Sequence, residues 1–276
     1  MGEKYSKPDF QAIGFNVTTK CNLKCKGCIA MMDKYENPYT PDINTLLSDA
    51  ESLLECVNFI EEFYIVGGES FLNRKLHLLF DYLFNGEYSD KIGSIRVLTN
   101  ARIMPNKETL EILSKYNDKN EIHFSEYDDK NKQNIAKLRE LGINCIGYAP
   151  EPWSDAGVTD FRGRSVVELK RMYSKCYSNK YHNCVVNGEL HPCPRSAHSK
   201  DLGLIPDYKS DYVNLREGSA ESRISQMHEL QNKDYICSCN HCDFPFEIRV
   251  PGKEFNENKL SYEKEFAFPI SQKTAT

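Results

Sequence analysis

Three cysteines stand close together near the start of the chain: Cys21, Cys25 and Cys28, with the spacing C-x3-C-x2-C. Three thiolates on one tight loop can hold three corners of a cubane iron–sulfur cluster, whereas a cluster that only carries electrons normally has four protein ligands. The missing ligand would leave one iron open to a substrate or cofactor, just as an open position distinguishes catalytic from structural zinc sites. The alternative is a zinc knuckle completed by a distant residue, since no suitable His or fourth Cys lies close in the sequence.

The remaining cysteines are grouped as well. The chain has 11 cysteines in 276 residues, an odd number and too few for a secreted disulfide scaffold of this length. Two further groups and two isolated residues make up the rest: Cys176, Cys184 and Cys193; Cys237, Cys239 and Cys242; and Cys56 and Cys145 alone. In a reducing compartment, such grouping suggests metal ligation rather than disulfide bonds.

Composition excludes several classes of function. The chain has 35 Lys and Arg against 40 Asp and Glu, a net charge of −5. A protein that binds a phosphate backbone needs a basic surface, so nucleic acid is not expected as a partner. No apolar run approaches the roughly 18 residues that span a bilayer, and residues 1–10 contain no apolar signal-peptide core. We therefore expect a cytoplasmic protein without a membrane partner.

The elements that position these cysteines follow a regular pattern up to about residue 150. Short β-rich runs alternate with amphipathic helical stretches, which predicts a parallel α/β sheet. The strands are expected at 12–18, 63–66, 95–98, 122–124 and 145–148. The helices are expected after caps at Thr40, Asn73 and Asn106 and before a left-handed cap at Gly142.

Polar or glycine-rich residues recur where the expected strands end. Gly67-Gly68-Glu69 follows the second strand, Asn100 the third and Ser125 the fourth. The carboxyl ends of parallel strands are where α/β sheets and barrels place their sites, so these residues are candidates for binding.

After Pro150 the pattern changes. We expect a short helix at 166–173, a hairpin at 185–190 turned by Asn187-Gly188, and a helix at 220–230. This predicts three parts: residues 1–150 with the alternating units, a small cysteine-bearing α+β domain at 151–250, and a polar tail at 251–276.

The C-x3-C-x2-C run after a strand and the Gly-Gly-Glu segment after the next one resemble the radical S-adenosylmethionine (radical SAM) enzymes. The resemblance covers roughly residues 10 to 150 and implies a partial, six-stranded (β/α) barrel. It implies that Cys21, Cys25 and Cys28 bind a [4Fe-4S] cluster whose open iron is chelated by SAM. It also implies that the backbone of Gly67-Gly68-Glu69 receives the SAM amino group, with the glycines allowing the close approach.

Further SAM contacts are implied at later strand ends. Asn100 and Ser125 stand where the family reaches the SAM carboxylate and ribose, although ordinary capping explains these residues as well. The residue before the third cysteine is usually aromatic and packs near the adenine, but here it is Gly27. Tyr148 is our candidate for that contact.

The later cysteines resemble the auxiliary-cluster domains of many radical SAM enzymes. The pattern Cys176-x11-Gly188-x4-Cys193 matches the opening of such domains, and Cys239 and Cys242 supply a paired end. These four could hold a second [4Fe-4S] cluster, because the hairpin returns the strand close to Cys176. No cysteine follows Cys242, so the chain resembles the shorter, one-cluster twitch form of the SPASM domain. A zinc site is the alternative.

Several residues near these groups have open roles. Cys184 and Cys237 could replace an assigned ligand, lie in the core, or donate hydrogen to a substrate radical, whereas Cys56 and Cys145 are expected in the core. Others could line a substrate pocket, support the ligands, or lie on exposed loops: Trp153, Arg162, Arg164, His191 and His241.

The resemblance implies a reaction. One electron from an external reductant of the flavodoxin or ferredoxin type, passed through the first cluster, cleaves SAM to methionine and a 5′-deoxyadenosyl radical. That radical abstracts hydrogen from an unactivated carbon. Our first hypothesis is an oxidoreductase that dehydrogenates a small polar metabolite such as an amino sugar or polyol, since this gives the second cluster a role as electron acceptor.

Two alternatives stay open. An epimerase or peptide-modifying enzyme would use a cysteine as hydrogen donor; the expected barrel starts at residue 12, so no N-terminal peptide-recognition domain is expected. A non-catalytic electron-transfer or zinc protein belongs to another class. It is disfavoured because the first group lacks a fourth cysteine and is followed by the Gly-Gly-Glu turn.

Overall fold

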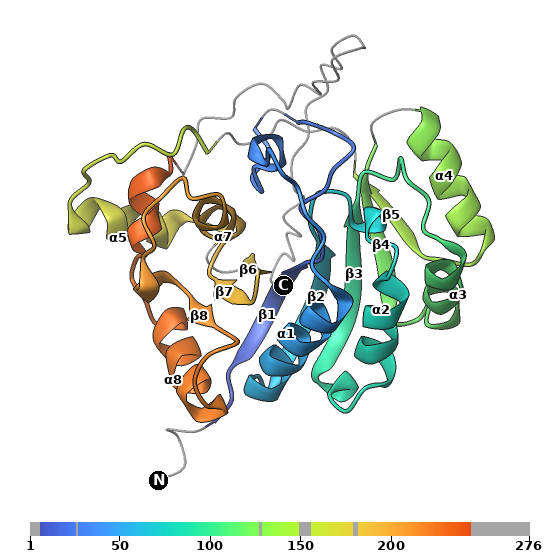
Figure 1. Ribbon diagram of the computed structural model, residues 1–276, viewed down its shortest axis with the longest axis horizontal. Coiled ribbons are helices and arrows are strands. Elements are labelled where there is room, and N and C mark those ends of the chain that lie inside the picture. The colour runs from blue at the N-terminus through green and yellow to red at the C-terminus, as the bar shows by residue number, and fades with distance from the viewer. Residues whose placement is uncertain (1–5, 26, 127–128, 149–155, 179–181, 244–276) are drawn as a thin grey trace, which may run out of the picture.

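The computed structural model describes residues 6–25, 27–126, 129–148, 156–178 and 182–243. Its centre is one eight-stranded sheet with the order β5-β4-β3-β2-β1-β6-β7-β8 (Figure 1). The strands are β1 Asp9–Asn16, β2 Phe59–Val66, β3 Ile92–Thr99, β4 Asn120–Ser125, β5 Cys145–Tyr148, β6 Asn183–Val186, β7 Glu189–His191 and β8 Val213–Asn214. The helices are α1 Ile43–Cys56, α2 Leu76–Asn85, α3 Lys107–Lys115, α4 Asp129–Glu140, α5 Val166–Lys175, α7 Pro194–Asp201 and α8 Ala220–Gln231.

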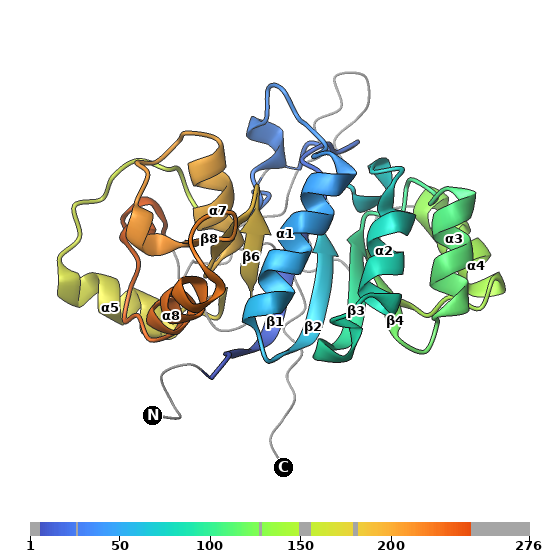
Figure 2. The ribbon, with the colours of Figure 1, turned by 60° about the horizontal axis from the view of Figure 1, so that its bottom comes forward.

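The first five strands confirm the expected parallel α/β architecture. Strands β1 to β5 are parallel in sequence order, and helices α1 to α4 lie on one face of this part of the sheet (Figure 2). Alternate strand residues pack against these helices in a continuous apolar core, among them Phe15, Phe63, Val97 and Phe124. Each strand alternates its side chains between the two faces, so these apolar residues all lie on the face under the helices. Burial of that apolar face holds the helices to the sheet.

The opposite face of these strands is the more polar one, and we call it the inner face. The register pairs Gly14 with Tyr64, Tyr64 with Arg96, and Arg96 with Glu121. Residues paired in this way point to the same side of a sheet. The inner face therefore carries charged and aromatic side chains, whereas the face under the helices is apolar.

The sixth parallel strand lies at an unexpected place. A six-stranded barrel built consecutively would add this strand beside β5, but β6 pairs in parallel with β1, where Ile13 aligns with Asn183. The cysteine-bearing part beyond residue 150 thus continues the same sheet rather than forming a separate layer (Figure 1). The domain boundaries at 150 and 250 stay a prediction, and Trp153 and the tail beyond Pro251 lie outside the described residues.

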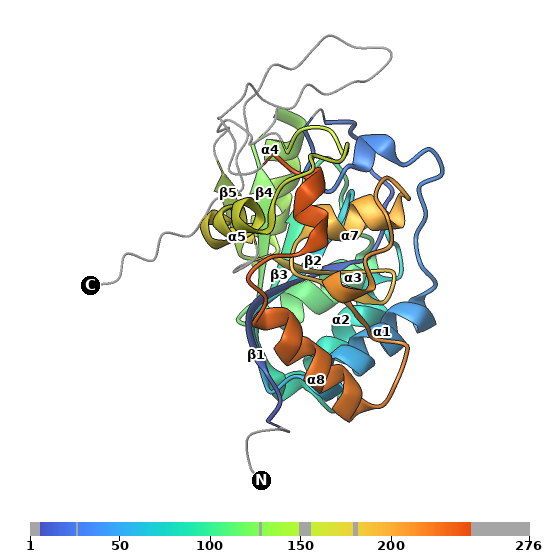
Figure 3. The ribbon, with the colours of Figure 1, turned by 90° about the vertical axis from the view of Figure 1, so that its left-hand side faces the viewer.

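The hairpin was predicted correctly. Strands β6 and β7 are antiparallel, and their turn has φ of 50° at Asn187 and 77° at Gly188. Both positive values suit the type I′ turn that an Asn-Gly pair favours. Helix α7, which follows directly, was not predicted from the sequence. Helix α8 lies beside β1 in Figure 3 and adds Ile224 and Met227 to the main core.

Helix starts differ from the predictions in two places. Helix α1 is capped by Asp42, whose side chain accepts from Asn44 N–H at 2.9 Å, rather than by Thr40. Helix α2 begins after Lys75, and the side chain of Asn73 accepts from Lys75 N–H instead of capping the helix itself. The left-handed Gly142 after α4 is confirmed, with φ of 78°. None of the described helices is long and apolar enough to cross a membrane.

An ion pair joins the half of the sheet that contains β6 to β8 to helix α1, which covers the half that contains β1 to β5. The guanidinium of Arg216, after β8, donates to both carboxylate oxygens of Asp49 on α1 at 2.7 and 2.8 Å. The same group donates to the Asn187 side chain at 3.2 Å. A Cβ added at Gly188 would lie 2.4 Å from Arg216 Nε, so the hairpin turn also depends on glycine for space.

We expect Asp49→Ala to lower the free energy of unfolding by about 2 kcal/mol, because it leaves the Arg216 guanidinium without its bidentate partner. Asp234→Ala is the matched control, since Asp234 pairs with Lys170 on an exposed surface, where an ion pair contributes little to stability. Urea unfolding of the two variants measures the difference. Equal midpoints would show that the Asp49 pair does not hold the halves together.

Candidate functional site

The first cysteine group lies on the loop after β1, at the carboxyl ends of the parallel strands. Cys21 and Cys25 pack around the buried Leu23, and Leu23 N–H points at Cys21 Sγ at 3.4 Å. A turn from Cys25 O to Cys28 N–H brings the third cysteine back toward the others. Burial raises the pKa of Cys21 to about 12, and the nearby Cys28 thiol contributes to the same shift. Such thiols become thiolates when they bind a metal. Three cysteine thiolates are donors of the kind that hold an iron–sulfur cluster.

The Gly-Gly-Glu segment after β2 lies directly against this loop. Gly68 N–H donates to Thr18 O at 2.9 Å, and Glu69 N–H donates to Lys20 O at 2.8 Å. A Cβ added at Gly68 would lie 2.3 Å from Lys20 O and 2.8 Å from Cys21 Cβ. The glycines are therefore required for close approach to the cysteine loop. Their predicted role in the approach of the backbone to SAM stays a prediction. Because an amino group donates, the acceptors available to SAM in this segment are its carbonyl groups.

The Glu69 side chain has a positioning role. It is fully buried, and its carboxylate accepts from Thr99 Oγ1 at 2.7 Å, Asn100 N–H at 2.8 Å and Phe71 N–H at 3.1 Å. Burial raises the pKa of Glu69 to about 7, and these three hydrogen bonds oppose that shift. The carboxylate thereby fixes the end of β3 against the end of β2.

Asn100 lies within reach of the cysteine loop. The side-chain nitrogen of Asn100 donates to Oδ1 of Asn22, which lies between the first two cysteines, at 2.8 Å. The side-chain oxygen Oδ1 of Asn100 accepts from Arg102 N–H at 3.0 Å. Ser125 ends β4 half-buried, and its backbone carbonyl accepts from the Asn131 side chain. The structure thus gathers both residues at the edge that carries the cysteines, and their SAM contacts stay predictions.

Tyr148, the candidate for the adenine contact, lies beside His123, and its contact with SAM stays a prediction. Its hydroxyl lies 2.6 Å from His123 Nδ1, and the two rings are 5.5 Å apart on the inner face. Gly27 has φ of 79°, a left-handed conformation that an aromatic residue would adopt only with strain, and a Cβ there would meet none of the described residues within 4 Å.

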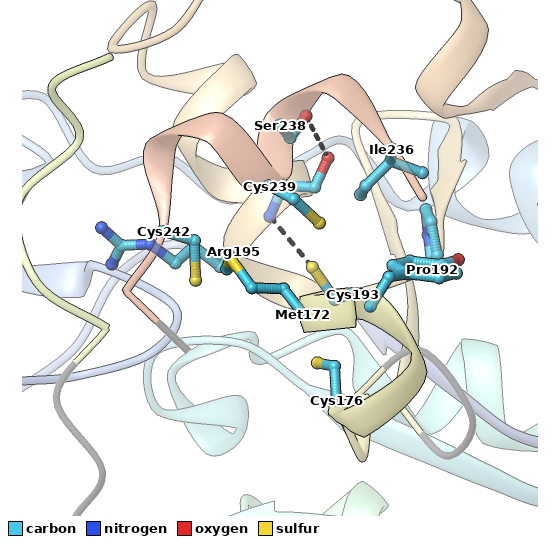
Figure 4. A pocket seen from close by; sticks show the side chains of 11 residues that line it. Met172, Cys176, Pro192, Cys193, Arg195, Ile236, Ser238, Cys239 and Cys242 are labelled. Atoms are coloured by element: carbon cyan, nitrogen blue, oxygen red, sulfur yellow. Dashed lines mark hydrogen bonds between the residues drawn. The ribbon is translucent and has the colours of Figure 1, made fainter. Parts of the chain in front are cut away.

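The second cysteine set converges on one pocket. Cys176, Cys193, Cys239 and Cys242 line it together with Met172, Tyr173, Pro192, Arg195 and other residues (Figure 4). Cys193 caps α7, and Ser196 N–H points at its sulfur at 3.4 Å. Burial and the three other cysteines raise the pKa of Cys193. The four cysteines that the spacing predicted as a ligand set thus line one pocket, although no group of three or more metal-binding side chains among the described residues is already arranged to hold a metal ion. Their binding of a cluster stays a prediction.

Arg162 and Arg164 stabilise the backbone around this pocket. Arg164 donates to the carbonyls of Cys239 and Cys242 at 3.0 and 2.7 Å, and both Arg162 and Arg164 pair with Asp243. A substrate-lining role for these two side chains is thus replaced by a structural one. Both histidines are engaged close by: His191 with Ser196, and His241 with Thr159 and Tyr208.

The unassigned thiols lie apart from the four-cysteine pocket. Cys184 is buried on β6 against Val186 and Ala197 of α7. Cys237 shares a 3₁₀ turn with Cys239 but does not line the pocket, and its N–H donates to Asp211 at 2.9 Å. Cys56 and Cys145 belong to the main core, as expected.

Helix α7 connects the two cysteine sites. It starts at Cys193, and near its other end Asp201 accepts from the hydroxyls of Tyr35 and Tyr39 at 2.7 and 2.9 Å. Ser199 also contacts the sulfur of Met31, three residues after Cys28. The segment that follows the first cysteine group is therefore held by the helix that begins at the second.

The family comparison decides between the classes considered above. Residues 15–150 match the radical SAM superfamily. The chain belongs to the radical SAM superfamily. The match runs from the end of β1 through β5 and includes the three clustered cysteines, the Gly-Gly-Glu segment and the strand ends beside them. SAM and the [4Fe-4S] cluster of the superfamily are accordingly expected at Cys21, Cys25 and Cys28.

Solved structures of radical SAM enzymes have the same fold. Native anSMEcpe with bound AdoMet is 12% identical, with 81% of this chain and 82% of that chain covered and a TM-score of 0.52. Streptococcus suis SuiB bound to its precursor peptide SuiA is 13% identical, with 84% and 70% covered and a TM-score of 0.55. BtrN in complex with AdoMet and 2-DOIA is 14% identical, with 86% and 94% covered and a TM-score of 0.45. No curated protein matches the sequence.

One candidate residue at this site, Asn16, was not predicted from the sequence. Asn16 ends β1 on the inner face with 3% of its surface exposed, and neither its amide oxygen nor its amide nitrogen has a hydrogen-bond partner among the described residues. Its oxygen lies 3.2 Å from where a Cβ of Gly67 would stand. Buried unpaired amides are rare in folded proteins, so Asn16 is a candidate to bind a polar group of SAM or substrate. A polar residue at the last strand position before the cysteines was the available signal.

We expect Gly68→Ala to reduce both iron at the first site and SAM binding, because the added Cβ would push the Lys20–Cys21 backbone away from β2. The matched control is Gly203→Ala, where an added Cβ meets nothing within 4 Å and the positive φ alone costs about 1 kcal/mol. Iron analysis and SAM equilibrium dialysis of the reconstituted variants measure the effect. Wild-type iron and SAM affinity in Gly68→Ala would contradict this role of the glycine.

Proposed function

We propose that this radical SAM protein dehydrogenates a small polar metabolite, such as an amino sugar or polyol, and that its four-cysteine pocket holds a second [4Fe-4S] cluster. In this proposal SAM supplies the radical that removes hydrogen from a carbinol or aminated carbon. A flavodoxin or ferredoxin type of protein supplies the electron that starts the reaction. The observation that carries the proposal is the convergence of Cys176, Cys193, Cys239 and Cys242 on one pocket.

A cluster held by four cysteine thiolates is suited to accept an electron. Four cysteines would satisfy all irons of a cubane, so the second cluster would have no open position for substrate. Dehydrogenation requires that the substrate radical lose one electron, and such a cluster is a suitable acceptor. The Ser196 N–H that points at Cys193 would stabilise the reduced, more negative cluster, since hydrogen bonds to cluster sulfurs raise the reduction potential.

The thiols that remain support dehydrogenation over epimerisation. An epimerase needs a hydrogen donor facing the substrate radical. Cys184 is 2% exposed beneath α7, and Cys145 packs into the core under the helices. Cys237 belongs to the 3₁₀ turn of the second site. Peptide modification is suggested by the peptides bound in the SuiB and anSMEcpe complexes, but a likeness at 13% identity supports the fold rather than the substrate.

The second cluster has a direct test. Anaerobic reconstitution should give about eight irons per chain, as two cubanes require. We expect Cys193→Ala to lower this to about four while SAM cleavage at the first site persists. Cys237→Ala is the matched control, because this cysteine shares the turn with Cys239 but does not line the pocket. Zinc in the second site, or loss of iron in the control, would overturn the assignment.

The reaction type is tested by the product formed in deuterium oxide. The probes are myo-inositol, glucosamine and N-acetylglucosamine, each supplied with SAM and a chemical reductant. We expect a product that has lost two hydrogens and contains no deuterium on carbon. A product of unchanged oxidation state with one deuterium on carbon would contradict dehydrogenation and restore a thiol donor.

A further inference from the structure

A continuous polar network crosses the inner face below the SAM edge. It starts at Tyr148 on β5, whose hydroxyl lies 2.6 Å from His123 Nδ1 on β4. His123 Nε2 lies 3.0 Å from Glu121 Oε2 on the same strand. Glu121 in turn faces Arg96 on β3, with the Arg96 Nε at 3.4 Å. Three neighbouring strands thus contribute to one chain of polar contacts.

The network has a defined direction for protons. A carboxylate only accepts, so Glu121 requires that His123 Nε2 carry the imidazole proton. His123 Nδ1 is then an acceptor, and the Tyr148 hydroxyl donates to it. A phenol oxygen keeps a lone pair when its proton is donated, so it can still accept a hydrogen bond from a second hydroxyl group.

The outer end of the network lies beside the SAM edge. Tyr148 is the last residue of β5, and the register pairs it with Ser125 at the end of β4. Its side chain is half-buried, whereas His123 behind it is 5% exposed. A substrate that faces SAM at this edge can therefore meet the tyrosine, while the histidine is reached only through it.

We propose that Tyr148, His123 and Glu121 form the proton relay that removes the hydroxyl proton of the substrate radical. The inference rests on the proposed dehydrogenation. After the radical derived from SAM has taken the carbinol hydrogen, the O–H bond of the substrate breaks and its proton passes to the Tyr148 oxygen. The tyrosine proton moves to His123 Nδ1. The unpaired electron leaves to a one-electron acceptor, an oxidised iron–sulfur cluster, and the carbon–oxygen double bond forms.

The charges around His123 suit a proton acceptor. Burial is the main cause that lowers the pKa of His123 below its usual value, and Arg96 adds to it, so the imidazole is neutral and free to accept at pH 7. The resulting imidazolium would face Glu121 on its own strand. Glu62 and Tyr64 on β2 hold Arg96, at 2.8 and 2.9 Å. Two carboxylates against one guanidinium leave this part of the inner face able to accommodate the added positive charge.

The test uses the fully reconstituted protein with myo-inositol and glucosamine deuterated at their carbinol carbons. Two quantities are measured: deuterium transferred to 5′-deoxyadenosine, and ketone formed per 5′-deoxyadenosine. In Tyr148→Phe and His123→Gln we expect unchanged deuterium transfer, since hydrogen abstraction comes first. We expect ketone per 5′-deoxyadenosine to fall by about 10-fold to 100-fold, at or below the low end of what general bases contribute.

Matched controls separate the relay from general damage. Tyr116→Phe and His228→Gln make the same changes on the outer helices, where Tyr116 bonds Asn85 and His228 contacts Ser6 O. Both should keep the wild-type ratio. Because the pKa of His123 lies below its ordinary value, acidification should lower the ratio in the wild type only at pH values well below about 6.5, and should not lower it in His123→Gln. Because the Tyr148 side chain is half-exposed, we expect Tyr148→Phe to fold even if His123→Gln does not.

The outcomes distinguish this inference from the function on which it rests. If the wild type forms ketone and both relay variants keep its ratio of ketone to 5′-deoxyadenosine, the relay is wrong while dehydrogenation stands. If the wild type transfers deuterium from neither probe and forms no ketone, dehydrogenation of such metabolites fails, and the relay fails with it.

Discussion

The contact between the ends of β1 and β2 is the constraint on which the site depends. Two backbone hydrogen bonds and two glycines bring the Gly67-Gly68-Glu69 segment against Thr18–Cys21, with no space for a Cβ at Gly68. The buried Glu69 carboxylate then extends this contact to the end of β3. One packed junction therefore places the cysteine loop and the polar strand ends relative to each other. In this account the Gly-Gly-Glu segment builds the site as well as lining it.

The second constraint is the continuity of the sheet across both cysteine sites. Strand β6 pairs with β1, and the hairpin that it starts leads through Cys193 into α7. The far end of α7 holds Tyr35 and Tyr39 from the first cysteine segment through Asp201. The two sites are thus fixed by one sheet and one helix rather than by a flexible connection between domains. Fixed separation is what electron transfer between a substrate at the first site and an acceptor at the second would require.

Sequence patterns predicted the parts of this arrangement that depend on local chemistry. The cysteine spacing, the Asn187-Gly188 turn and the apolar strand faces were sufficient for the superfamily, the hairpin and the parallel sheet. The place of β6 was not predictable, because pairing with β1 joins residues far apart in the chain. The Tyr148–His123–Glu121 network was missed for the same reason. Alternation on each strand puts these side chains on one face, but only the register between β4 and β5 brings them together.

With Cys21, Cys25 and Cys28 as its three protein ligands, the first cluster would have one iron open to SAM. Electron paramagnetic resonance of the reduced protein, with electron–nuclear double resonance on SAM labelled with ¹⁵N at its amino group, tests it most directly. The Cys193→Ala variant removes the signal of the proposed second cluster from this measurement. We expect SAM to change the spectrum and its labelled nitrogen to couple to the cluster. A spectrum unchanged by SAM, without nitrogen coupling, would contradict it.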